Sequence, residues 1–108
     1  MPAQSETPIL DLLARMTADS LEVSSLDDRT NMLVRVAALV AVDAPPASYL
    51  LNLGLAGEAG VDEEEVRSVL AIVAPIVGTA RVAAAAGNIA RALGFALEFA
   101  ELEARAEG

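Results

Sequence analysis

The 108-residue sequence contains no cysteine, no histidine and no lysine, and each absence excludes a class of chemistry. Without a thiol there is no cysteine redox catalysis and no disulfide. Without an imidazole the most common general acid and base is missing. Without a lysine amine no Schiff base can form. The sequence therefore excludes thiol, imidazole and amine catalysis, and it implies no cofactor.

Aromatic residues are also scarce, with two phenylalanines, one tyrosine and no tryptophan. The core must therefore be aliphatic and rich in alanine. The apolar fraction of 55% exceeds the roughly 45–50% typical of soluble domains. Residues 1–108 are expected to form a single domain, which has too little interior to bury that much apolar surface. We therefore expect a homo-oligomer, with self-association covering the excess.

Positive charge is limited to seven residues against sixteen acidic ones, which gives a net charge of −9. This acidic chain is not expected to bind nucleic acid or anionic membranes, because both require clustered cations. The longest apolar runs, Val36–Val42 and Val69–Ala80, are shorter than the roughly 20 residues that span a bilayer. The segment MPAQSETPIL lacks the features of a secretory signal, so a cytoplasmic location is expected. Abundant alanine and arginine without lysine are typical of a high-GC bacterium.

The pattern along the chain predicts an all-α fold of about five to six helices. Thr7–Pro8 combines a capping hydroxyl with a proline suited to the first helical position. We expect a loop over Ser20–Ser25, with Ser25 and Asp28 forming a capping box. The second helix is predicted over Leu26–Val42, and its nearly all-round apolar surface indicates a central, buried helix.

The third helix is predicted from Pro46 to Gly60 and the fourth over Glu63–Val77, with Pro75 ending or kinking the latter near Ala74. Gly78-Thr79 is expected to separate the fourth helix from a fifth. The fifth helix is predicted to begin at Ala80 and to end at Leu93. Residues 95–106 then continue as an amphipathic helix.

Three polar residues near the start of the third predicted helix, Ser48, Tyr49 and Asn52, are candidates for a site. Ser48 and Asn52 are four residues apart and share one helix face, so they can line the same pocket. Ser48 and Asn52 are candidate catalytic residues and Tyr49 is a candidate ligand-binding residue. A serine nucleophile is disfavoured because no histidine or lysine exists to activate it. The alternative is that these groups cap the helix or bond across an interface.

Two arginines, Arg35 and Arg81, interrupt apolar segments. An arginine in such surroundings usually pairs with a carboxylate, often across an interface, which is the structural interpretation. The functional interpretation is a bidentate contact with the carboxylate of a ligand. Arg35 is therefore a candidate catalytic residue and Arg81 a candidate ligand-binding residue.

The acidic run from Asp62 to Glu65 has the composition of a metal or catalytic carboxylate cluster. Consecutive residues point in different directions around a helix, however. Asp62 with Glu65 also fits a capping box, and acidic residues stabilise a helix N-terminus. We interpret the run as structural and predict no metal site.

Taken in order, LVRVAALVAVDAPPASYLLNLGLAGEAGVDEEEVRSVLAIVAPIVGTARVAAAA resembles the carboxymuconolactone decarboxylase and AhpD-like family. The likeness is strongest over residues 26–93. Its most telling parts are the AGVDEEEV segment and Ala74–Gly78. The resemblance implies an all-helical domain that assembles into trimers, hexamers or related rings.

The functional residues of that family are absent from this sequence. Counting back from Gly60, the resemblance places the family's Cys-x-x-Cys pair on Pro45 and Ser48 and its histidine on Asn52. It also places a glutamate of the family near Met32. A thiol-dependent alkylhydroperoxidase is therefore excluded. A lyase-type or small-carboxylate-binding oligomer is the first hypothesis, since an arginine can still bind a dicarboxylate. A non-catalytic structural or binding oligomer of the same fold is the alternative.

Overall fold

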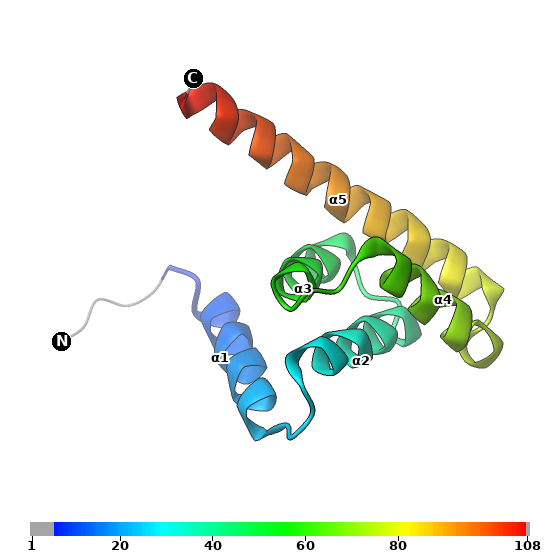
Figure 1. The fold of residues 1–108 in the computed structure, drawn as a ribbon. Helices are drawn as coiled ribbons and strands as arrows, with labels where there is room; N and C mark the ends of the chain where they lie inside the picture. The colour runs from blue at the N-terminus through cyan, green and yellow to red at the C-terminus, as the bar shows by residue number, and fades with distance from the viewer. Residues whose placement is uncertain (1–5, 108) are drawn as a thin grey trace.

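The computed structural model describes the backbone of residues 6–107 and, within it, the side chains of residues 6–94 and Arg105. The described backbone contains helices and no strands, so the predicted all-α class is confirmed. The five helices are α1 (Pro8–Val23), α2 (Asp28–Ala41), α3 (Pro46–Glu58), α4 (Glu63–Val77) and α5 (Thr79–Glu107) (Figure 1).

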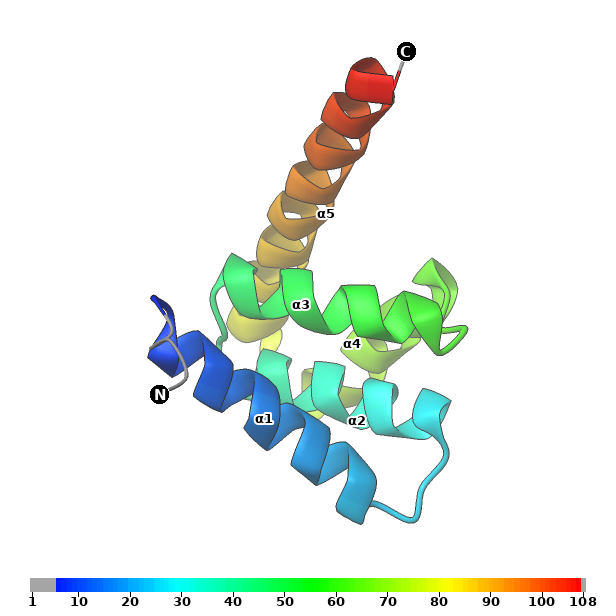
Figure 2. The ribbon, with the colours of Figure 1, turned by 90° about the vertical axis from the view of Figure 1, so that its left-hand side faces the viewer.

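Helices α2, α3, α4 and the N-terminal half of α5 pack into one body. Helix α1 lies along one side of that body, and the C-terminal half of α5 projects beyond it (Figures 1 and 2). Among the described side chains the core is aliphatic and alanine-rich, as predicted, with Tyr49 as its aromatic member. Its central cluster consists of Val40, Ala44, Tyr49, Ala85, Ile89 and Ala92.

Helix α2 is buried on one face only, which corrects the prediction of a helix covered all round. Met32, Val36 and Val40 recur every fourth residue and are fully or almost fully buried. Val34 on another face is 55% exposed, and Val42 after the last turn is also exposed. The apolar residues on this outer side therefore remain uncovered in the single chain.

The first loop is shorter than predicted. Ser20 belongs to α1, where its hydroxyl donates to the carbonyl of Thr17 at 3.0 Å. The N-cap of α2 is Asp27 and not Ser25: its carboxylate accepts from the backbone N–H of Thr30 at 2.7 Å. That bond to the backbone is the main cause of a lowered pKa for Asp27.

Helices α2 and α3 end in the same way. In α3 the N–H of Val61 reaches the carbonyl of Ala56 at 2.9 Å, with Gly60 at φ = +86°, which is a Schellman motif and fits the predicted C′ glycine. In α2 the corresponding left-handed residue is Asp43, at φ = +56°. Both turns point the chain sharply into the next segment.

The second capping box, Asp62 with Glu65, is confirmed in both directions at the start of α4. Pro75 lies inside α4 and does not end it, because the helix continues to Val77. Gly78, at φ = +93°, separates α4 from α5 as predicted. Helix α5 is then one continuous helix of 29 residues, so the two predicted C-terminal segments are merged. The predicted apolar face of residues 95–106 lies outside the described side chains.

Candidate functional site

Arg35, in the middle of α2, is the centre of the main polar group of the body. Its Nε donates to Oδ1 of Asn52 on α3 at 2.7 Å. Its two terminal nitrogens donate to hydroxyls of α1, Nη1 to Ser20 at 3.4 Å and Nη2 to Thr17 at 3.3 Å. A half-buried guanidinium thus joins three helices.

Asn52 is 5% exposed and is held from both ends. Its Nδ2 donates to the backbone carbonyl of Ser48, one turn earlier in α3, at 2.8 Å. This bond fixes the amide orientation and directs the carbonyl oxygen toward Arg35. The predicted proximity of Ser48 and Asn52 is therefore found, but Ser48 contributes its backbone carbonyl to this network.

The described partners of Arg35 are all neutral, so the expected carboxylate partner is not found among the described residues of the single chain. Within the part of the chain that the structure describes, the ion pairs join Arg29 to Glu65 and Arg67 to Glu63 and Glu64. Arg35 takes part in none of them. Its positive charge is solvated by one amide and two hydroxyls, which leaves it without a counterion among these residues.

A cavity of about 210 Å³ opens beside this network and is lined by Arg35, Ala38, Leu39 and Asn52. It is smaller than the 300–1,000 Å³ typical of pockets for drug-sized ligands. A cation and an amide on one side, with aliphatic groups on the other, suit a small molecule with one charged end. Thr17 and Ser20 were missed at the sequence level, although two hydroxyls three residues apart on one helix face were a usable signal.

Tyr49 and Arg81 lie apart from this cavity. Tyr49 is fully buried in the core, and its hydroxyl has no hydrogen-bond partner among the described residues. Burial, and secondarily the charge of Asp43, raises the pKa of Tyr49. Arg81 is exposed, and its Nη1 donates to the carbonyl of Ala41 at the end of α2. Arg81 therefore caps a helix C-terminus, where a cation is favourable, and the expected carboxylate partner is absent from its described contacts.

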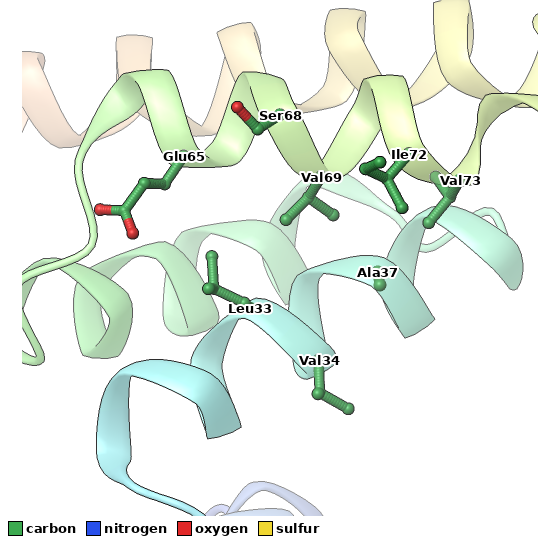
Figure 3. A pocket seen from close by; sticks show the side chains of 8 residues that line it. All are labelled: Leu33, Val34, Ala37, Glu65, Ser68, Val69, Ile72 and Val73. Carbon is green, nitrogen blue, oxygen red and sulfur yellow. The ribbon is translucent and has the colours of Figure 1, made fainter.

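A larger and almost wholly apolar groove of about 400 Å³ lies between α2 and α4. Figure 3 shows α2 side chains on one wall and α4 side chains on the other. The polar groups are at one end, where Glu65 is already bonded to Arg29. The lining consists of Leu33, Val34, Ala37, Glu65, Ser68, Val69, Ile72 and Val73.

The acidic run at the start of α4 is structural, as interpreted from the sequence. Glu63 and Glu64 both pair with Arg67, and the bond to Glu63 is the main cause of a raised pKa for Arg67. No group of three carboxylates in the described part of the chain is arranged to hold a metal ion. None of the helices described there has the length and hydropathy to cross a membrane.

Comparison with known proteins identifies one family. The sequence model of the carboxymuconolactone decarboxylase family matches residues 8–92, well over half of the chain. The match covers α1 to α4 and the part of α5 that packs on the body. No curated protein and no solved structure matches the chain.

Proposed function

We propose, on the basis that the chain belongs to the carboxymuconolactone decarboxylase family, that it is a cysteine-free homo-oligomer that binds a small carboxylate beside Arg35 and Asn52. A thiol-dependent peroxidase reaction is excluded for this member, because the chain has no cysteine. What the chain offers in its place is an arginine site.

The observation that carries the proposal is the missing counterion of Arg35. A half-buried charge without a counterion is costly, and an arginine in that position is usually paired with an anion. Its partners in the described chain are an amide and two hydroxyls, and a cavity adjoins it. A ligand carboxylate would supply the missing charge in the bidentate geometry that guanidinium favours.

The composition of the cavity favours binding over catalysis. Its four lining residues are one arginine, one asparagine and two aliphatic residues, and none of these is among the usual general acids and bases. Lyase-type chemistry would need a proton donor or acceptor beside the ligand. We therefore propose a binding function for this site, without catalysis by the residues that line it.

Titration of the purified protein with acetate, malonate and succinate, followed by the NMR signal of the Arg35 Nε–H, tests the proposal. We expect a saturable shift, strongest for the dicarboxylate that best fits the cavity. Because Arg35→Met removes the observed group, this variant is followed by the backbone amide signals of Ala38, Leu39 and Asn52, which should no longer shift. Arg91→Gln, which removes the same charge from an exposed position of α5, should keep the wild-type response of the Arg35 signal. If the three anions shift no signal beyond the effect of sodium chloride at equal ionic strength, the binding proposal is wrong.

The oligomeric part of the proposal is supported by large apolar side chains that the single chain leaves uncovered. On α4 these include Ile72, 76% exposed, and Ile76, 83% exposed, next to the apolar groove. Such a surface favours self-association. Light scattering should give a mass three or six times the 11.1 kDa of the chain. A stable monomer at micromolar concentration would contradict this expectation.

A further inference from the structure

Helix α1 is attached to the body by very little packing. None of its residues is buried, although it carries a large number of apolar side chains. A cavity of about 350 Å³ lies between α1 and the body, with Leu21 of α1 on one side and Met32 and Leu55 among the residues on the other. The exposed apolar residues of its N-terminal half are Ile9, Leu10, Leu12, Leu13 and Met16.

Polar contacts therefore account for much of the attachment. Ser24, directly after α1, donates to Oδ1 of Asn31 at 2.6 Å. The other two contacts are those of Thr17 and Ser20, and both end on the terminal nitrogens of Arg35. The candidate ligand site and the anchor of α1 thus share one guanidinium group.

A hydroxyl and a carboxylate differ in how strongly they bind the guanidinium group of Arg35. The hydroxyl contacts are 3.3 and 3.4 Å long, whereas a guanidinium–carboxylate bond is about 2.7–2.9 Å and roughly twice as strong as a neutral one. A carboxylate bound in fork geometry occupies both terminal nitrogens. We propose that Thr17 and Ser20 compete with the carboxylate for Arg35, so that carboxylate binding releases α1 from the body.

This inference rests on the proposed carboxylate site and adds a coupling to it. Because coupling between two equilibria is reciprocal, loosening α1 must strengthen carboxylate binding by the same factor by which the carboxylate loosens α1. The two hydroxyls then set the affinity of the site from outside the cavity. If the two hydroxyls only oriented Arg35 for the ligand, their removal would weaken carboxylate binding, whereas competition predicts that their removal strengthens it.

Hydrogen exchange of the α1 amides, read by mass spectrometry, tests the anchor without ligand. Thr17→Val with Ser20→Ala removes both hydroxyls and should accelerate exchange across residues 17–23 by about tenfold, the equivalent of about one lost bond to a charged group. Alanine favours helix more than serine does, so a faster exchange cannot come from lower helix propensity at position 20. Ser68→Ala, which removes a serine hydroxyl from α4, is the matched control and should leave α1 unchanged.

Succinate at saturating concentration, against sodium chloride of equal ionic strength, tests the competition. It should accelerate α1 exchange in the wild type but not further in the double variant, and the double variant should bind succinate about three- to tenfold more tightly. Arg35→Met should show fast α1 exchange and no response to succinate.

The outcomes separate the two proposals. If neither the wild type nor any variant binds succinate, the proposed carboxylate site is wrong, and the proposed competition is wrong as well. If succinate binds but α1 exchange stays the same in the double variant and with ligand, only the competition is overturned. Weaker binding by the double variant overturns it as well, because the hydroxyls would then orient Arg35 for the ligand.

Discussion

Two of the cavities to which helix α2 contributes differ in almost every respect. Toward α4, Leu33, Val34 and Ala37 line an apolar groove whose few polar groups are already paired. Toward α3, Arg35 lines a smaller cavity and carries a charge without a counterion among the described residues. Successive residues of a helix differ by about 100° in direction, which is how neighbouring positions reach opposite sides.

The α2–α4 groove can recognise a partner by its apolar shape, whereas the Arg35 cavity can recognise a partner by its charge. The α2–α4 groove has no unsatisfied polar group among its described lining, so it suits another apolar surface. The Arg35 cavity has a fixed charge and a fixed amide, so it suits a small anion. We propose self-association for the first and ligand binding for the second.

The largest expected effect is on the apolar side. Ile72→Glu with Ile76→Glu places two charges on the exposed face of α4 and should dissociate the oligomer, because an unpaired carboxylate at an apolar interface is not solvated. Light scattering should then show the 11.1 kDa monomer. Val23→Glu, at another exposed apolar position on α1, is the control and should keep the wild-type mass. An oligomer that persists in the double variant would place the interface elsewhere.

The next effect is on the polar side. Asn52→Leu removes the closest acceptor of Arg35 and leaves its Nε unpaired, which should lower the free energy of unfolding by about 2 kcal/mol. Chemical denaturation at fixed protein concentration measures the change. The oligomeric mass should stay as in the wild type, because the α2–α4 groove is untouched. Unchanged stability would mean that water replaces the amide at no cost.

The smallest expected effect is a change of stability at Tyr49 in the core. Tyr49→Phe removes a buried hydroxyl that has no partner among the described residues, and should raise the free energy of unfolding by about 1 kcal/mol. Burial raises the pKa of Tyr49, so the wild type should keep its stability below about pH 10, the ordinary tyrosine value, and lose it above. Denaturation between pH 7 and pH 11 should show that loss in the wild type and a smaller one in the variant. A destabilised variant would mean that the hydroxyl has a partner in the assembly.

The sequence was sufficient for the parts of the fold that local chemistry determines. The capping box at Asp62 and the left-handed turn at Gly60 each depend on a few neighbouring residues, and both are present. The spacing of Ser25 and Asp28 predicted the cap of α2 at Ser25, whereas the backbone geometry places the cap at Asp27. Pro75 was expected to end or kink α4, and the end is wrong, because a helix can continue past the bond that proline removes.

The sequence predicted which residues belong to the site but not which of them contact one another. Arg35 and Asn52 were both candidates, but their contact depends on how α2 packs on α3. A carboxylate was expected beside Arg35 because an arginine in apolar surroundings usually pairs with one, yet the acidic residues that form described ion pairs do so with Arg29 and Arg67. Long-range choice of partner is set by packing, which residue type does not encode.

The C-terminal half of α5 projects beyond the body, so a small tilt at its base would produce a larger displacement at its far end. Ala92 is the last residue of the core among the described side chains, and from there the helix continues for fifteen residues to Glu107, or about 22 Å at 1.5 Å per residue. A tilt of only about 10° where α5 packs on α3 and α4 would move its far end by about 4 Å. A probe placed near residue 107 would thus magnify small adjustments of the core into displacements large enough for distance measurements.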